Sequence, residues 1–450
     1  MGNIKNTFDL QNPWRFPGYK FPEEASISRN IYDSLLQDLS AKEVTILVGA
    51  RQVGKTFLIK KLVEELISKK GIDPKQVFYF NLDAFNLIDL VSQDREFIDF
   101  ISYYGLSGKT SFVIFDEAQR IPEVGLLIKQ YYDLGLDLKF IVSGSFFLQI
   151  KSQVKETLTG RKRLHELYPV SFGEFLHFKG LGGARDLSMV MKFEASQYQK
   201  LLKEFILFGG YPGVVKADSR ENKELLLKEL YRSYVEKDIS NFLKIEDIAG
   251  FNRLVQFLAA QSGGLLKINE VSKNIRVSRH FVEKYLHALN ETYVTACLRP
   301  YFVNLGKAII KTPKLYFLDT GIRNAVFNTF DAFDRGAEAG LMVENFVFSE
   351  LIKTVDPKQL WFYRTSTGSE IDFLYVQKNR VVPVEVKYRI TRQKVVPKIF
   401  NTFAKGAGVN KVVVITKDYL YDEERENFRV IFRPAWSVCD LWMELGTGTK

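Results

Sequence analysis

Short apolar runs alternate with amphipathic stretches over the first part of the chain. The runs VTILVG, VFYFNLD, SFVIFDE and KFIVSGS each have the length of a strand, and RLHELYPV follows them. Parallel neighbouring strands need a crossover connection, usually a helix, so this alternation predicts a parallel sheet covered by helices. We therefore expect an α/β fold, with the first domain over residues 1–175.

The pattern changes after residue 175. Residues 176–245 carry apolar residues at helical spacing on both sides of a Gly-Gly-Tyr-Pro break, which predicts a helical segment. Residues 246–306 combine two short helical patterns around the tight turn IRVS with a longer helix and β-prone residues, which is typical of a winged helix-turn-helix. Residues 307–450 return to mixed helices and strands, and we expect a second α/β domain there.

Composition narrows the classes of protein. The 450 residues include 63 Lys and Arg against 53 Asp and Glu, and the net charge of +10 favours an anionic partner such as nucleic acid. No apolar run approaches the roughly 18 to 20 residues that a membrane helix needs, so we expect no membrane partner. The N-terminus has no apolar secretory core, and the only cysteines, Cys297 and Cys439, suit a reducing compartment. We therefore expect a cytoplasmic protein.

Residues 49–56, GARQVGKT, match the P-loop pattern between an apolar strand and an amphipathic helix. Glycines let backbone N–H groups surround the phosphates, a lysine neutralises the β- and γ-oxygens, and a hydroxyl ligates magnesium. The alternative, a glycine turn without a ligand, does not require the full motif in this context. The pattern predicts a site for ATP and Mg²⁺ formed by Gly49, Ala50, Arg51, Gln52, Val53, Gly54, Lys55 and Thr56.

Acidic and hydroxyl residues follow the next two apolar runs. The run FVIFDEAQ ends in Asp116, which can hold the magnesium ion, and Glu117, which can polarise the attacking water. The run ending in IVSGS offers Ser143 or Ser145 as a polar sensor of the γ-phosphate, although a serine-capped turn explains these residues equally well. Together with the P-loop, they predict hydrolysis of ATP.

Arg161 and Arg163 lie in GRKRLHELYPVSFGEF, after the expected core strands. A basic cluster is usually a solvated surface, but Arg161 can also act as an arginine finger on the γ-phosphate of a neighbouring subunit. With FGGYPGVV and YVEKDI, these motifs resemble the prokaryotic AAA+ ATPases that carry an uncharacterised C-terminal domain with a nuclease-like core. The resemblance covers nearly the whole chain, and it implies an AAA+ core, a small helical lid over 176–245 and assembly into a homo-oligomer.

Positive charge is concentrated in the expected winged helix-turn-helix. Residues 267–311 hold eight Lys and Arg against three Asp and Glu. Ser278, Arg279 and Lys284 on the expected recognition helix, with Arg276 before it, can meet a DNA groove or phosphates. Winged helices also mediate protein contacts or close an AAA+ lid, so this alternative stays open. We expect duplex or branched DNA as the partner.

The run GSEIDFLYVQKNRVVPVEVKY, residues 368–388, predicts a hairpin with three misplaced charges. Strand alternation places Glu385 and Lys387 on one face, within reach of Asp372 on the paired strand. This arrangement is typical of PD-(D/E)xK nucleases, in which acids bind magnesium and the lysine orients the attacking water. Glu344, on a preceding helix, is the candidate fourth acid and metal ligand. Pro383 disturbs a central strand, which leaves the register open.

These patterns predict an ATPase that acts on DNA, with a restriction-endonuclease-like C-terminal domain over residues 307–450. The candidate metal ligands are Thr56 and Asp116 at the ATP site and Glu344, Asp372 and Glu385 at the nuclease-like site. The alternative is a nucleotide-dependent switch or scaffold, because nuclease-like folds also serve as binding modules without catalysis.

Overall fold

The structure is a computed structural model with two compact units, residues 1–168 and 169–450. It describes residues 2–23, 26–105, 108–145, 158–183, 186–233, 247–302, 311–331, 333, 338–378, 380–388 and 396–440. The motif YVEKDI, residues 234–239, and the turn residue Asn379 lie outside these residues. Within them, no helix is both long enough and apolar enough to span a bilayer.

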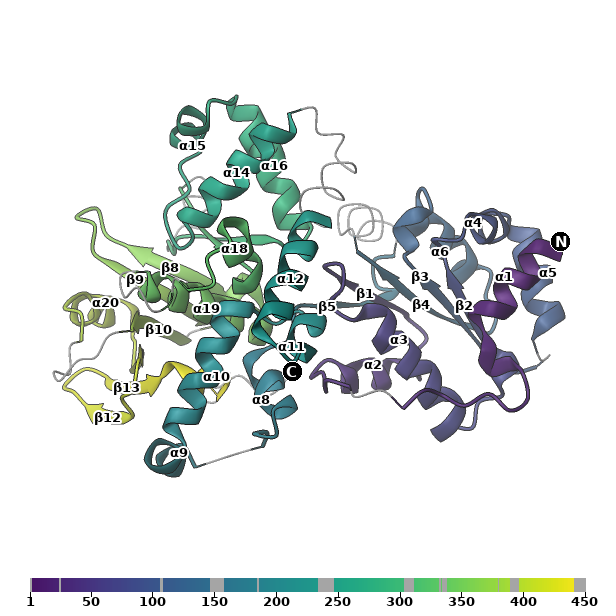
Figure 1. Ribbon diagram of the computed structural model, residues 1–450, viewed down its shortest axis with the longest axis horizontal. Coiled ribbons are helices and arrows are strands. Elements are labelled where there is room, and N and C mark those ends of the chain that lie inside the picture. Colours follow the sequence, from purple (N-terminus) through teal and green to yellow (C-terminus); the bar gives the residue numbers. More distant parts are fainter. Residues whose placement is uncertain are drawn as a thin grey trace. The chain divides into compact units, whose positions relative to one another are not determined.

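A five-stranded sheet forms the centre of the first unit (Figure 1). All of its neighbouring strands are parallel, as the sequence predicts, so the carboxyl ends of the strands meet at one edge. Its strands, in spatial order, are β2 (Val77–Asn81), β3 (Ser111–Asp116), β4 (Leu138–Gly144), β1 (Val44–Gly49) and β5 (Lys162–Leu167).

Aromatic side chains attach helices to one face of this sheet. Phe97 packs against Phe115 of β3 and Tyr131, and Tyr131 stacks on Phe140 of β4. Helices α2 and α3 lie on the other side of the sheet (Figure 1). The helices of this unit are α1 (Gly2–Gln11), α2 (Tyr32–Asp38), α3 (Lys55–Glu64), α4 (Phe85–Ser92), α5 (Asp94–Tyr104) and α6 (Val124–Asp133), with the short turns η1 (Pro13–Arg15), η2 (Glu65–Lys69), η3 (Pro74–Gln76) and η4 (Ala118–Arg120).

The segment predicted as a helical lid packs within the second unit. Asn324 Nδ2 donates to the carbonyls of Ile206 and Leu207, at 3.0 and 2.9 Å, and Asp319 Oδ2 accepts from the N–H of Gly210 at 2.7 Å. These contacts join α10 (Ala195–Phe208) to α18 (Thr320–Phe327). The other helices of the segment are α8 (Phe172–Phe178), α9 (Leu187–Phe193), α11 (Pro212–Lys216) and α12 (Arg220–Leu230).

Three helices and a two-stranded antiparallel sheet follow, and the order differs from the prediction: IRVS lies between the second and third helices, and the third leads directly into β6 with no longer helix after it. Arg276 ends the second helix in the left-handed region, with φ of 57°, and Ser278 caps the third by accepting a 3.0 Å hydrogen bond from the N–H of Phe281. This is the tight turn that the run IRVS predicts. The elements are α14 (Ile248–Ala260), α15 (Ile268–Ile275), α16 (Arg279–Glu291), β6 (Thr295–Leu298) and β7 (Lys314–Phe317).

The C-terminal part has a mixed six-stranded sheet (Figure 1). Strands β9 and β10 form the predicted hairpin, with Phe373 opposite Val384. Pro383 stands directly before the first residue of β10 that pairs with β11, where a strand tolerates a missing N–H group. The elements are α19 (Ala339–Thr354), η7 (Pro357–Gln359), β8 (Leu360–Arg364), β9 (Glu370–Gln377), β10 (Arg380–Lys387), α20 (Ile399–Ala407), β11 (Lys411–Thr416), β12 (Tyr421–Glu424), β13 (Arg429–Pro434) and η8 (Ala435–Asp440).

Candidate functional sites

The P-loop lies between β1 and α3, as predicted. Gly49 ends β1 so close to β5 that a Cβ there would come within 2.2 Å of the carbonyl oxygen of Leu167, and Gly54 before α3 has φ of 100°. Both positions therefore require glycine. Lys55 Nζ donates to the carbonyls of Gly49 at 2.9 Å and Ala50 at 2.7 Å, and burial lowers the pKa of Lys55 to about 8. The lysine thus folds back onto its own loop.

The carboxylate of Asp116 joins side chains from four elements at the carboxyl edge of the first sheet. Its Oδ2 accepts hydrogen bonds from Thr56 Oγ1 at 2.7 Å and from the hydroxyl of Tyr79 at 2.8 Å, and its Oδ1 accepts one from Ser143. The hydroxyl of Thr56 and the carboxylate of Asp116 are the hard oxygen donors that Mg²⁺ prefers, so these residues fit the ion predicted there.

Glu117 is held by two residues that complete a small network. Its carboxylate accepts a 3.2 Å hydrogen bond from Ser145 Oγ and another from Gln119 Nε2, and Gln119 Oε1 accepts from the N–H of Ser145 at 3.1 Å. Glu117 itself lies in the left-handed region, with φ of 55°. The sequence reasoning missed Gln119 and Tyr79. The position of Gln119, two residues after the acid pair, was the available signal.

Arg161 lies away from the phosphate loop of its own chain. It directly precedes β5, whose Lys162 is opposite Val44, whereas Leu167 at the far end of β5 is opposite Gly49. A strand of this length spans about 17 Å. The guanidinium of Arg161 pairs with Asp133 Oδ1 at 2.6 Å. The role of Arg161 as a finger in trans stays a prediction.

The hairpin brings Asp372, Glu385 and Lys387 together, as predicted. The N–H of Asp372 donates to Glu385 Oε2 at 3.3 Å, the N–H of Val386 donates to Asp372 Oδ2 at 2.8 Å, and Lys387 Nζ contacts Glu385 Oε1. Burial raises the pKa of Asp372 to about 8, with further repulsion from Glu344 and Glu385. Burial also raises the pKa of Glu385. Burial therefore favours the protonated form of both carboxyl groups.

Glu344 on α19 lies beside this cluster, but its carboxylate forms an ion pair with a lysine. Lys314 Nζ of β7 lies 3.0 Å from Glu344 Oε1 and 3.9 Å from Asp372 Oδ1, and it also pairs with Glu370 of β9. The hydroxyl of Tyr316 donates to the same Glu344 oxygen at 2.7 Å. Lys314 and Tyr316 were not predicted, because β7 precedes the hairpin by more than fifty residues, and Glu370, the first residue of β9, was not predicted either.

Glu344, Asp372 and Glu385 stay the predicted metal ligands of this cluster, and a lysine lies beside them. Among the residues that the structure describes, no group of three or more His, Cys, Asp or Glu side chains is arranged to hold a metal ion. The ammonium group of Lys314 lies 3.0 Å from Glu344 Oε1 and 3.9 Å from Asp372 Oδ1. Asp372 and Glu385 offer the hard oxygens that Mg²⁺ prefers, whereas the Glu344 carboxylate already pairs with a lysine.

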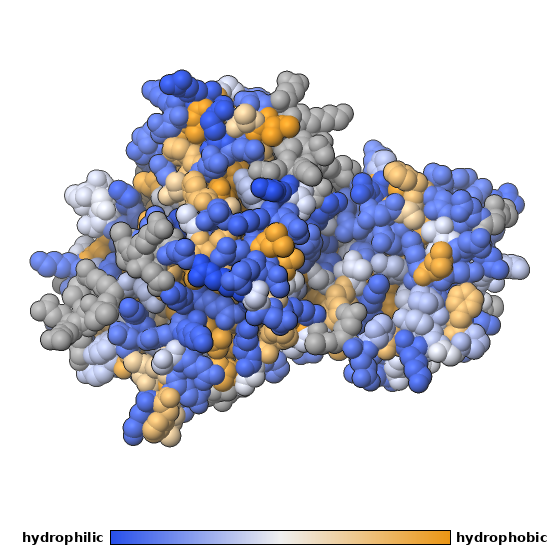
Figure 2. Space-filling view, viewed as in Figure 1, coloured by the Kyte–Doolittle hydropathy of each residue, from blue (hydrophilic) through white to orange (hydrophobic). Residues whose placement is uncertain are grey.

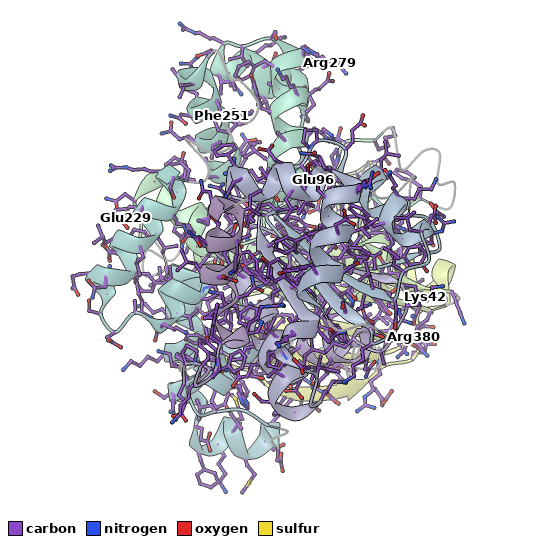
Figure 3. All side chains as sticks on the ribbon, turned by 90° about the vertical axis from the view of Figure 1, so that its right-hand side faces the viewer. Lys42, Glu96, Glu229, Phe251, Arg279 and Arg380 are labelled. Atoms are coloured by element: carbon purple, nitrogen blue, oxygen red, sulfur yellow. The ribbon has the colours of Figure 1, made fainter. Side chains whose placement is uncertain are left out.

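The charged residues of α16 are exposed at the surface of the second unit. Arg279, labelled in Figure 3, is 65% exposed and pairs with Glu283 at 2.8 Å along the same helix. Lys284 Nζ lies 5.3 Å from the ring centroid of Tyr285. In Figure 2, hydrophilic and hydrophobic residues are mixed on this part of the second unit, and Arg279 and Lys284 are both exposed. These side chains are therefore accessible to a large anionic partner.

Comparison with known families identifies the first site. Residues 41–176 match the family described as AAA domain. This region is a P-loop AAA+ ATPase domain. Its match spans the P-loop, the Asp116–Glu117 pair, Ser143 and all of β5. Two further stretches match domains of unknown function, DUF8612 over residues 199–332 and DUF4143 over residues 339–436.

Three relatives from other organisms are similar over most of this chain. An uncharacterized protein of Haemophilus influenzae is 25% identical over 429 residues, covering 92% of this chain and 99% of that protein. An uncharacterized protein of Mycobacterium tuberculosis is 27% identical and covers 78% of this chain and 72% of its own. One of Methanocaldococcus jannaschii is 26% identical, with coverage of 81% and 78%.

Solved structures with similar chains include two from Aeropyrum pernix. The ORC1 protein in complex with DNA has a TM-score of 0.32 at 14% identity and covers 70% of this chain and 96% of its own. The ADP form of the ORC2 protein has a TM-score of 0.34 at 13% identity, with coverage of 73% and 98%. Similarities of this size carry no conclusion about the activity of this chain.

Proposed function

We propose that the protein is an AAA+ ATPase that binds DNA and cleaves its phosphodiester bonds at the Asp372–Glu385–Lys387 site with Mg²⁺. The observation that carries the nuclease part is the joint position of these three side chains: two hydrogen bonds join Asp372 of β9 to β10, and Lys387 contacts Glu385 within β10. Two acids and a lysine in this arrangement are the parts that metal-assisted hydrolysis requires.

At the ATP site, each residue has a distinct task. With ATP bound, Lys55 would leave the carbonyls of Gly49 and Ala50 for the β- and γ-phosphates, since a phosphate is a stronger partner than a carbonyl. Thr56 and Asp116 would hold the magnesium ion, and Ser143 would orient Asp116. Glu117 accepts the proton of the attacking water once Gln119 and Ser145 position its carboxylate.

At the nuclease-like site, Asp372 and Glu385 would bind the metal ion, which supplies charge to activate water and to stabilise the phosphorane-like transition state. Lys387, one-third exposed, is placed to orient that water because its ammonium already contacts Glu385. The α14–α16 helices with β6 and β7 form the proposed winged helix. Ser278, Arg279 and Lys284 of this module would contact the DNA backbone.

The test is cleavage of a panel of linear, single-stranded and branched DNA with Mg²⁺, with and without ATP. Wild type, Lys55→Ala and Asp372→Asn are compared in parallel, with Glu424→Gln, a 78% exposed acid of β12, as the control. We expect Asp372→Asn to abolish cutting and Lys55→Ala to abolish its dependence on ATP. Intact DNA in every wild-type reaction would refute the nuclease.

A second candidate function is a nucleotide-dependent switch whose C-terminal domain binds a partner without catalysis. The lysine within the acid cluster favours it, because an internal cation satisfies the carboxylates without metal. In that case Asp372→Asn leaves the function of the protein in cells intact, whereas Lys55→Ala abolishes it.

A further inference from the structure

Lys314 is a buried cation in the middle of the acidic site. Its side chain is only 3% exposed, and its Nζ has ion-pair partners from two different elements, Glu344 on α19 and Glu370 on β9. Asp372 Oδ1 is the next oxygen, at 3.9 Å. A buried ammonium is costly unless charged partners surround it, so this cluster is a specific arrangement and not a surface coincidence.

The backbone fixes this lysine in place. Lys314 pairs with Leu298 of β6 and forms a bridge with Leu265, and the preceding Pro313 carbonyl accepts from the N–H of Leu266 at 2.7 Å. Its ammonium also lies 5.7 Å from the ring centroid of Phe362. These backbone contacts and the neighbouring ring hold the Lys314 ammonium beside the carboxylates.

The two lysines of the cluster contact different carboxylates. Lys387 contacts Glu385, whereas Lys314 contacts Glu344 and Glu370. A divalent ion near Glu344 would lie within a few ångströms of the Lys314 ammonium, where like charges in a poorly hydrated site repel strongly. The Asp372–Glu385 side lies farther from this ammonium than the Glu344–Glu370 side does.

We propose that Lys314 takes the place of a second divalent cation, so that the C-terminal site binds a single ion at Asp372 and Glu385. Glu344 and Glu370 then serve as positioning residues for the lysine and are not metal ligands. This inference rests on the proposed function, since it assumes that Asp372 and Glu385 hold a metal ion.

The test is titration of nucleotide-free, full-length protein with Mn²⁺, followed by the EPR signal of the free ion. All proteins carry Asp116→Asn, which removes the other candidate ion site. We expect one Mn²⁺ per chain, lost with Asp372→Asn. Glu344→Gln should change the affinity for Mn²⁺ by no more than about twofold, because the Glu344 carboxylate pairs with Lys314 and does not bind the ion. A loss of about tenfold or more would make Glu344 a ligand and overturn the proposal.

A second variant tests the cation itself. Lys314→Met should bind one additional Mn²⁺, or bind the first about tenfold more tightly, because the repelling charge is gone. Lys223→Met is the matched control: it removes another buried lysine, paired with Glu204 at 2.7 Å, and should leave binding unchanged. If Lys314→Met folds and binds Mn²⁺ as the wild type does, Lys314 is not a substitute for an ion.

The outcomes separate this inference from the proposed function. Binding of Mn²⁺ by Lys314→Met alone, with none in the wild type, would overturn the single-ion site and remove the metal-dependent nuclease as well. Equal binding by wild type and Lys314→Met would remove the substitution and leave the nuclease possible. If Lys314→Met does not fold, the Mn²⁺ affinity of Glu344→Gln tests the proposal instead. This variant should fold, since replacing a carboxylate by an amide of the same shape disturbs packing least.

Discussion

Thr56 and Asp116, sixty residues apart in the chain, share a 2.7 Å hydrogen bond between the threonine hydroxyl and the aspartate Oδ2. Thr56 is the second residue of α3 and Asp116 is the last residue of β3, so the bond joins the end of the P-loop to the end of a strand. The same two side chains can share a magnesium ion, and the hydrogen bond holds both in place before the ion arrives.

We expect Thr56→Ala to lower ATP hydrolysis by at least about a hundredfold, because one ligand of the ion and one partner of Asp116 are lost together. Steady-state phosphate release measures the effect. Thr56→Ser, which keeps the hydroxyl, is the control and should retain most of the activity. Hydrolysis by Thr56→Ala within a factor of about three of wild type would show that this hydroxyl does not serve the ion.

Glu117→Gln should separate nucleotide binding from hydrolysis. The amide keeps the contacts with Gln119 and Ser145 but cannot accept a proton, so we expect hydrolysis to fall about a hundredfold to ten-thousandfold while ATP affinity stays near wild type. Binding of a fluorescent ATP analogue and phosphate release are measured on the same sample. Glu123→Gln, after the same strand, is the control. A variant that still turns over ATP would exclude Glu117 as the base.

The finger role of Arg161 predicts complementation between two inactive proteins. Lys55→Ala cannot hold ATP but keeps Arg161, whereas Arg161→Ala holds ATP but has no finger. If Arg161 acts in trans, a mixture of the two should hydrolyse more ATP than the sum of the separate proteins. Arg163→Ala, whose guanidinium pairs with Asp38 at 3.0 Å, serves as the control. A mixture no more active than its components would leave Arg161 as a surface residue paired with Asp133.

The exposed cations of α16 predict salt-dependent DNA binding. Arg279→Ala and Lys284→Ala should each weaken binding, and each should reduce the slope of log affinity against log salt by about one if the side chain meets a phosphate. Fluorescence anisotropy with labelled duplex DNA at several salt concentrations measures both. Lys200→Ala, an exposed lysine of α10, should leave affinity and slope unchanged. Unchanged slopes in both α16 variants would remove this helix from the interface.

Lys139 at the start of β4 predicts a pH effect on the first unit. Burial lowers the pKa of Lys139 from 10.5 to about 8, so above pH 8 the unfolded chain binds more protons than the folded one. The free energy of unfolding should therefore rise between pH 8 and pH 9.5, by up to about 1 kcal/mol per pH unit from this residue. Lys139→Met should reduce this rise in urea denaturation curves. An identical pH dependence in the variant would contradict the prediction.

The sequence predicts the local parts of both sites well, because their geometry follows from adjacent residues. GARQVGKT lies between a strand and a helix, Asp116 ends a buried strand, and the hairpin places Asp372 opposite Glu385. In each case strand alternation or the position of a motif at a strand end fixes where the side chain lies.

Long-range partners were decided by the tertiary structure alone. No periodic pattern in the chain predicts three of these contacts. They are the hydrogen bond from Gln119 to Glu117, the packing of the 176–233 helices against α18, and the ion pairs of Lys314 with the acids. A lysine in a four-residue strand looks like any exposed charge until folding surrounds it with carboxylates. The sequence by itself therefore determined which acids meet on the hairpin, whereas only the packing of β7 against α19 and β9 decided that a lysine takes a place among them, because such proximity depends on how distant elements pack.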